Sequence, residues 1–135
     1  MRGSGGGCLL ILVVDDSQVT RDVCRTMLET FGYRVIQASE GREAICTASA
    51  NPVDLILMDL SLPGADGLVV TKALRSISTL KDVPIVAMTA YPESLSKDKA
   101  LAAGCDAYLE KPVTMERLTA ILHQFARNGD RPNLA

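Results

Sequence analysis

Three carboxylates, one hydroxyl and one ammonium group in this sequence are of the types that phosphoryl transfer requires. They belong to Asp15, Asp16, Asp59, Thr89 and Lys111. Carboxylates that lie close together repel one another unless a cation joins them, and Mg²⁺ prefers such hard oxygen ligands. A carboxylate can also attack phosphorus and form an acyl phosphate, while an ammonium and a hydroxyl stabilise the phosphoryl oxygens. This chemistry requires a fold that brings the five residues together.

Five short apolar segments precede these polar residues and predict the strands of a sheet. The segments are 9–14, 34–38, 53–58, 84–88 and 105–109. Continuous apolar runs are typical of parallel strands that are covered on both faces. Helical patterns separate the segments, so the order strand–helix recurs five times. The sequence therefore predicts an α/β fold, a doubly wound (βα)5 open parallel sheet with helices on both faces.

Spacing and capping residues place five helices after the strands. The first is expected between Ser17 as its N-cap and Gly32 as the residue that stops it. Its apolar residues recur every fourth position and predict the buried face. They are Val19, Val23, Met27 and Phe31, widened by Cys24 and Leu28. The other helices are expected at 40–50, 70–77, 92–103 and after the N-cap residue Thr114.

All five polar residues follow a predicted strand directly or within two positions. Ligand sites in open parallel sheets lie beyond the carboxyl ends of the strands, so the topology predicts that these residues meet at one rim. Each residue alone has an ordinary explanation, because aspartates favour turns and helix starts and most lysines lie on the surface. Their joint placement favours a functional site.

The same segments resemble the CheY-like receiver domain of two-component response regulators, over nearly the whole chain from Leu9 to Arg127. The matching motifs are Val13-Val14-Asp15-Asp16, Leu57-Met58-Asp59, Leu62-Pro63-Gly64-Ala65-Asp66-Gly67, Pro84-Ile85-Val86-Ala87-Met88-Thr89-Ala90 and Lys111-Pro112. Each motif alone is weak, but all of them in this order are highly specific. The resemblance implies a flavodoxin-like fold with strand order 2-1-3-4-5 and a receiver domain at residues 8–127.

The resemblance also implies a phosphoacceptor and a cofactor. Asp59 would accept the phosphoryl group with the help of Mg²⁺. Asp16 would bind the metal directly and Asp15 mainly through water, while Asp59 and the backbone carbonyl of Ser61 would complete the protein ligands. The implied function is a phosphoryl-accepting signalling switch of a two-component system.

Further roles follow from the same resemblance. Thr89 and Lys111 would hold the phosphoryl group, and the peptide bond between Lys111 and Pro112 would be cis, which X-Pro bonds permit. Thr89 would move toward the phosphoryl group and vacate space for Tyr108. The surface of the fourth helix, fifth strand and fifth helix would then change shape for a partner, or for a second copy in a homodimer.

Turnover is expected to be limited to the chain's own acyl phosphate. A receiver catalyses its own phosphorylation and dephosphorylation, so we expect no enzyme activity toward other substrates. Ser61 and Tyr91 would border the phosphoryl group and tune how readily water attacks it. The bulk of Tyr91 is expected to slow hydrolysis.

Composition limits the partners and the compartment. The net charge is −2, from 14 basic and 16 acidic residues, with no basic cluster suited to direct nucleic-acid binding. No apolar run approaches the roughly 18 residues that span a bilayer. The cysteines are widely spaced, which predicts reduced, buried thiols in the cytoplasm; they are Cys8, Cys24, Cys46 and Cys105. The implied phosphodonor is a histidine kinase or a histidine phosphotransfer protein.

The two ends of the chain are expected to lie outside the domain. Residues 1–7 are rich in glycine and look like a flexible leader of the kind that cloning adds, and residues 128–135 are expected to form a flexible tail. Because no second domain is apparent, the chain is expected to be a stand-alone regulator or a piece of a hybrid kinase or larger regulator.

Three alternatives remain open on this architecture. An aspartyl-phosphate phosphatase would need Asp-x-Asp after the first strand, where this chain has Asp15-Asp16-Ser17. A nucleotide- or flavin-binding module would need a glycine- or hydroxyl-rich loop at the same place, which two aspartates occupy instead. A degenerate receiver that serves only as a binding scaffold would lack some of the five polar residues, and all five are present.

Overall fold

The computed structural model describes residues 9–62, 65–90 and 93–130. Several predictions fall outside the described residues. They concern the expected leader at 1–7, Cys8, Tyr91 and the last part of the expected tail, residues 131–135. Within the described part of the chain, no helix is long and apolar enough to cross a membrane.

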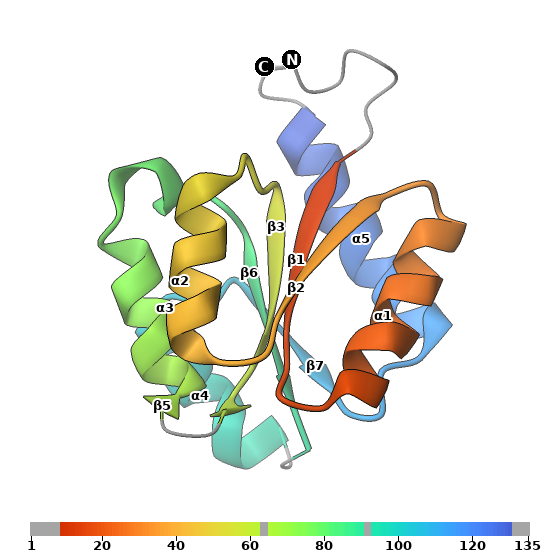
Figure 1. The fold of residues 1–135 in the computed structure, drawn as a ribbon. Coiled ribbons are helices and arrows are strands. Elements are labelled where there is room, and N and C mark those ends of the chain that lie inside the picture. Colours follow the sequence, from red (N-terminus) through yellow and green to blue (C-terminus); the bar gives the residue numbers. More distant parts are fainter. Residues whose placement is uncertain (1–8, 63–64, 91–92, 131–135) are drawn as a thin grey trace.

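A five-stranded parallel sheet forms the centre of the molecule (Figure 1). Its strands in chain order are β1 (Leu10–Val14), β2 (Arg34–Ala38), β3 (Leu55–Asp59), β6 (Ile85–Thr89) and β7 (Ala107–Glu110). They lie side by side in the order β2-β1-β3-β6-β7. Numbered along the chain, that is the predicted order 2-1-3-4-5, and it confirms the flavodoxin-like doubly wound fold.

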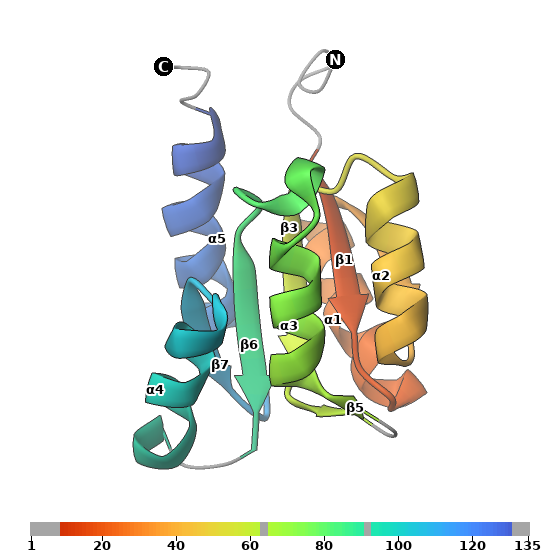
Figure 2. The ribbon, with the colours of Figure 1, turned by 90° about the vertical axis from the view of Figure 1, so that its left-hand side faces the viewer.

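Five helices cover the two faces of the sheet. One layer holds α1 (Gln18–Thr30) and α5 (Met115–Asp130), and the other holds α2 (Gly41–Ala50), α3 (Gly67–Arg75) and α4 (Glu93–Ala103). Figures 1 and 2 show the two layers on opposite sides of the strands. The helix α5 extends to Asp130, past residue 127, where the domain was expected to end.

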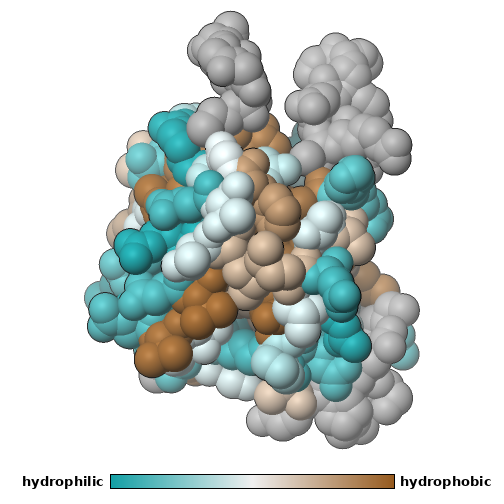
Figure 3. Space-filling view, turned by 90° about the vertical axis from the view of Figure 1, so that its right-hand side faces the viewer, coloured by the Kyte–Doolittle hydropathy of each residue, from teal (hydrophilic) through white to brown (hydrophobic). Residues whose placement is uncertain are grey.

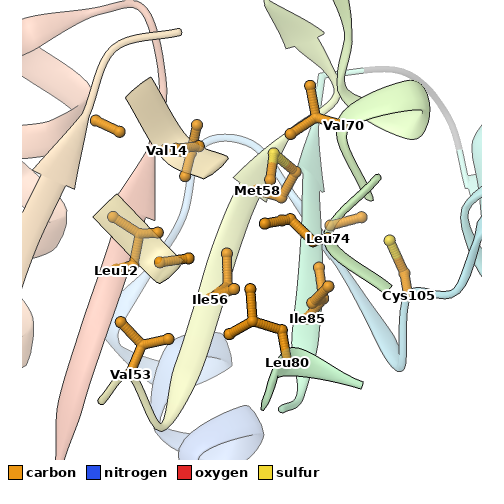
Figure 4. Packing of buried hydrophobic residues seen from close by; sticks show 14 of the residues in the cluster. Leu12, Val14, Val53, Ile56, Met58, Val70, Leu74, Leu80, Ile85 and Cys105 are labelled. Carbon is orange, nitrogen blue, oxygen red and sulfur yellow. The ribbon is translucent and has the colours of Figure 1, made fainter. Parts of the chain in front are cut away.

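Alternating side chains of the strands build two separate cores, one under each helix layer. On β1, Leu12 and Val14 point into the core beneath α2, α3 and α4, whereas Ile11 and Val13 point into the core beneath α1 and α5. Figure 4 shows the first core, in which residues from the central strands pack against α3. The central strand β1 is therefore apolar at every position, because both of its faces are buried.

The predicted buried face of α1 is confirmed at Cys24 and Leu28 but wrong at three other positions. The exposed fractions of Val19, Val23 and Phe31 are 72%, 47% and 40%, whereas Cys24 and Leu28 are buried. Residues four apart advance about 40° around a helix at each step, because a turn takes about 3.6 residues. Over the three steps from residue 19 to residue 31, the side chains therefore turn away from the narrow face of the helix that the sheet covers. Figure 3 shows the face of the molecule that α1 and α5 cover, with apolar surface among polar surface.

The residues predicted to begin or end helices α1 and α5 are confirmed. Ser17 is the N-cap of α1, and its hydroxyl oxygen accepts a hydrogen bond from the Thr20 N–H. Gly32, just beyond α1, has a φ of 90°. Thr114 precedes α5, and its hydroxyl oxygen accepts a hydrogen bond from the Arg117 N–H.

Short elements and one thiol differ from the prediction. The helix expected to reach Ile77 ends at Arg75, and a 3-10 turn, η1, follows at Ser78–Leu80. The Arg75 side chain joins these segments, because it donates hydrogen bonds to the carbonyls of Leu80, Lys81, Val83 and Gly104 and pairs with Asp106.

A two-stranded ladder, β4 (Ser61–Leu62) with β5 (Ala65–Asp66), was not predicted. Cys46 is exposed rather than buried.

Candidate functional site

The carboxyl ends of the parallel strands form one rim, which carries the polar residues that the sequence singled out. Figure 2 shows β1 and β6 pointing toward the same end of the molecule. Asp15 follows β1, Asp59 is the last residue of β3, Thr89 is the last residue of β6, and Lys111 follows β7. Hydrogen bonding along the parallel strands thus brings together residues that are up to 96 positions apart (111 − 15).

Three carboxylates meet at this rim. Asp15, Asp16 and Asp59 each offer a carboxylate oxygen, and these oxygens lie within 4.8 Å of one another. Asp15 and Asp59 are buried, with exposed fractions of 0% and 2%, whereas Asp16 is exposed. Two buried like charges are costly, so the rim needs positive charge to keep them ionised.

Lys111 supplies positive charge from the other side of the rim. Its Nζ lies 2.8 Å from Asp15 Oδ2 and 3.4 Å from Asp59 Oδ1. Although burial alone would lower the pKa of the Lys111 ammonium, its contacts with the two carboxylates outweigh that effect and leave the pKa raised. The ammonium therefore stays charged at the point where the carboxylates need it.

Backbone N–H groups hold the two buried carboxylates in place. The Ser17 N–H donates a hydrogen bond of 2.9 Å to Asp15 Oδ1, and the Ser61 N–H donates one of 3.0 Å to Asp59 Oδ1. Burial raises the pKa of Asp59, and the charge of Asp15 raises it further, while the Ser61 N–H and Lys111 work against that rise. Asp59 thus has a higher affinity for a proton than an ordinary aspartate.

The buried oxygen Asp15 Oδ2 gives a test of whether a metal ion fits. It is fully buried, and the ammonium of Lys111 lies against it at 2.8 Å. This oxygen therefore already faces positive charge, which is the environment that a metal ligand requires. Together with the other two carboxylates, it forms the hard oxygen donor set that suits Mg²⁺. The residues present therefore fit this ion.

Thr89 and Lys111 are joined through their backbones. Thr89 is buried, and its carbonyl accepts a hydrogen bond of 2.8 Å from the Lys111 N–H. The peptide bond between Lys111 and Pro112 is cis, as the resemblance implied. These contacts fix the backbone of both residues at the rim of the acidic cluster.

Tyr108 stands three residues before Lys111. It is half-buried on β7, where its Cα pairs with that of Ala87. It borders a surface pocket of about 340 Å³ between β7 and α5, to which Arg117 and Ile121 also contribute.

Sequence reasoning missed two residues that position the cluster. Gly67 begins α3 against the backbone of β3, so a Cβ there would overlap the carbonyl oxygen of Asp59 and lie 2.6 Å from the Cα of Leu60. Arg21, on α1, donates a hydrogen bond of 2.8 Å to the backbone carbonyl of Asp15. No pattern in the sequence marked Arg21, whereas Gly67 stood inside a quoted motif without an assigned role.

Comparisons with known proteins agree with this geometry. The profile of one family, described as the response regulator receiver domain, matches residues 11–123. The polar-differentiation response regulator DivK of Brucella ovis is 32% identical over 115 residues, which cover 85% of this chain and 94% of DivK.

Solved structures extend the comparison to three dimensions. The chemotaxis response regulator CheY4 of Vibrio cholerae has a TM-score of 0.83 at 32% identity, covering 87% of this chain and 98% of CheY4. The receiver domain of the sensor histidine kinase PA1611 from Pseudomonas aeruginosa, solved with a magnesium ion in its active-site cleft, has a TM-score of 0.82 at 35% identity. The match covers 88% of this chain and 98% of that domain.

Proposed function

The chain belongs to the response regulator receiver domain family, and from this premise we propose that Asp59 is the residue that accepts the phosphoryl group. The observation that carries the proposal is the cluster itself, in which Asp59 lies beside two further aspartates and the ammonium of Lys111. A carboxylate oxygen of Asp59 attacks phosphorus and forms an O–P bond, while the N–P bond of a donor phosphohistidine breaks. The electron pair of that bond stays on the imidazole nitrogen.

Asp15, Asp16, Asp59 and the backbone carbonyl of Ser61 are the groups that we propose to hold Mg²⁺. When bound, this ion neutralises charge on the carboxylates and on the phosphoryl oxygens. The protein itself helps to keep Asp59 ionised. The Ser61 N–H and Lys111 favour the ionised form and so oppose the rise in the pKa of Asp59 that burial causes. The magnesium ion in the related PA1611 receiver domain supports this assignment.

Thr89 and Lys111 are proposed to bind the transferred phosphoryl group. The ammonium of Lys111 is already 3.4 Å from Asp59, so it can follow the charge onto a phosphoryl oxygen. Thr89 ends the neighbouring strand and contributes a hydroxyl from the same rim. Phosphorylation would thus draw both residues toward Asp59.

That movement is proposed to drive the switch. If Thr89 shifts toward the phosphoryl group, the half-buried Tyr108 gains space, and the surface of α4, β7 and α5 changes shape. The pocket that Tyr108 borders lies on this surface and supports the idea. Both states exist beforehand, and phosphorylation shifts their populations. The same surface is our candidate for contact with a downstream protein or a second copy of the chain.

Two further assignments concern partners and lifetime. As a receiver, the chain takes its phosphoryl group from a histidine kinase or a histidine phosphotransfer protein, and we propose that it does so in the cytoplasm, where its buried thiols stay reduced. Ser61 and Tyr91 are proposed to tune hydrolysis of the acyl phosphate. Ser61 is next but one to Asp59, and Tyr91 lies outside the described residues.

Incubation with a small acyl phosphate and Mg²⁺, followed by intact mass measurement, tests the proposal. The expected result is a gain of one phosphoryl group that is lost with a chelator and in Asp59→Asn. The matched control is Asp22→Asn, which removes an aspartate from the surface of α1 and should leave the gain intact. Continuous release of phosphate at a steady rate would favour the phosphatase alternative, and the absence of any gain in the wild-type chain would favour the scaffold.

A further inference from the structure

Arg21 is not one of the residues of the acidic cluster, but its side chain contacts the backbone of Asp15. It stands one turn into α1, and its Nη1 donates a hydrogen bond of 2.8 Å to the carbonyl oxygen of Asp15. That oxygen belongs to the peptide unit that joins Asp15 to Asp16. This peptide unit is the stretch of backbone between the two residues that carry the carboxylates.

The guanidinium is itself held from a second direction. Arg21 Nε donates a hydrogen bond of 2.9 Å to Gln37 Oε1, and Gln37 belongs to the edge strand β2. One planar group therefore joins three segments, namely α1, the loop after β1, and β2. Because a guanidinium presents its donors in a rigid fork, both partners are fixed at once.

The remaining polar groups of Asp15 are also engaged. Its N–H donates to the carbonyl of Ala38, its Oδ1 accepts from the Ser17 N–H, and its Oδ2 faces Lys111. Two of these contacts come from side chains outside the three aspartates, namely Lys111 at Oδ2 and Arg21 at the carbonyl. Arg21 thus completes the set of contacts that fixes the Asp15–Asp16 segment.

We infer that Arg21, held by Gln37, is a positioning residue that fixes the Asp15–Asp16 peptide unit and thereby sets the affinity of the acidic cluster for Mg²⁺. The inference rests on the proposed function, because it assigns the cluster to that ion. It concerns a residue whose hydrogen bond to Asp15 goes to the backbone carbonyl and not to the carboxylate. Groups that orient metal ligands from behind change affinity by about tenfold or more when they are removed.

A positioning role and a purely electrostatic role of Arg21 predict opposite changes in Mg²⁺ affinity when the residue is replaced. A guanidinium near a cation site repels the cation, so if Arg21 acted only through its charge, its removal would strengthen Mg²⁺ binding. If Arg21 positions the ligands, its removal weakens binding although the repulsion is gone. The sign of the change therefore separates the two roles.

The experiment is calorimetric titration of the purified chain with Mg²⁺ alone. Arg21→Met is expected to weaken binding about tenfold. The matched control is Arg25→Met, which removes the same charge one turn further along α1, where Arg25 forms an exposed pair with Asp22. Gln37→Leu keeps every charge and is expected to cause a smaller loss, and Arg21→Lys is expected to bind more tightly than Arg21→Met because an ammonium can still donate to the carbonyl.

Each outcome decides a separate question. An unchanged or tighter affinity in Arg21→Met, with normal binding by the wild-type chain, overturns the inference and leaves the proposed function intact. A wild-type chain that takes up no Mg²⁺ overturns the proposed function and the inference with it. Circular dichroism establishes that each variant is folded. If Arg21→Met is not, Gln37→Leu and Arg21→Lys decide, and wild-type affinity in both overturns the inference.

Discussion

Lys111 Nζ lies 2.8 Å from Asp15 Oδ2, although β7 and β1, the strands that these residues follow, are separated in the sheet by β6 and β3. The lysine side chain thus reaches along the rim and places its charge between two buried carboxylates. It stabilises a cluster that would otherwise hold like charges together. The same ammonium must share these carboxylates with any cation that enters.

Removal of this ammonium is expected to destabilise the metal-free protein. In Lys111→Met the two buried carboxylates lose their counter-charge, which we expect to lower the free energy of unfolding by about 2 kcal/mol. Excess Mg²⁺ should restore part of that loss, because a dication takes over the same role. Urea denaturation with and without Mg²⁺ measures both effects. Lys81→Met, at an exposed position, is the control, and equal losses in the two variants would contradict the prediction.

The raised pKa of Asp59 predicts a pH-dependent stability. A carboxyl whose pKa is higher in the folded than in the unfolded state stabilises the fold below its ordinary pKa, and that contribution is lost as the pH rises through the folded value. At about pH 7 the wild-type chain therefore contains a costly buried charge that Asp59→Asn lacks. We expect Asp59→Asn to unfold at a higher temperature than wild type at about pH 7 without metal, and the difference to shrink toward about pH 4. A difference that grows as the pH falls would refute this.

Asp16 separates metal binding from folding. Its side chain is exposed, so Asp16→Asn should leave the stability of the metal-free protein unchanged. Wild type should gain about 2.7 kcal/mol at a Mg²⁺ concentration of about 100 times the dissociation constant, because the ion binds only the folded state. Asp16→Asn should lose most of that gain. Thermal unfolding over a Mg²⁺ series checks this, with Asp22→Asn as the variant that should behave as wild type.

Gly67 is expected to tolerate no side chain. Gly67→Ala would drive a methyl group into the backbone of β3 at Asp59, which we expect to cost about 2 kcal/mol or more and to displace the phosphoacceptor. Gly32→Ala is the comparison. Gly32 has open space around it and only a positive φ, so its cost should be about 1 kcal/mol. Denaturant unfolding ranks the two variants, and equal costs would show that the contact with β3 has little weight.

The sequence could predict the strand order and the rim because both depend on simple patterns. Apolar runs mark strands that are buried on both faces, and parallel strands send their carboxyl ends to one edge. Asp15, Asp59 and Lys111 could therefore be placed together before any coordinates were known. The cis peptide bond before Pro112 came from family resemblance alone, since the sequence permits it without requiring it.

Other features depend on packing that no pattern encodes. The every-fourth stripe on α1 predicted Val19 and Phe31 as buried, but which part of a helix faces the sheet depends on how the helix crosses it. The contacts of Arg21 and Gly67 depend on where the backbones of β1 and β3 run. Cys46 is exposed because its helix presents Ala44 and Ala48 to the core instead.

The division of the interior into two cores places one buried cysteine on each side of the sheet, so each thiol can report when its own helix layer opens. Cys24 lies in the core beneath α1 and Cys105 in the core beneath α4, and both thiols are buried. Burial raises the pKa of both, that of Cys24 to about 11, so neither forms the reactive thiolate readily while its layer is closed. An alkylating reagent would modify exposed Cys46 at once and each buried thiol only when its own layer opens. The order in which Cys24 and Cys105 are modified would therefore reveal which helix layer detaches first.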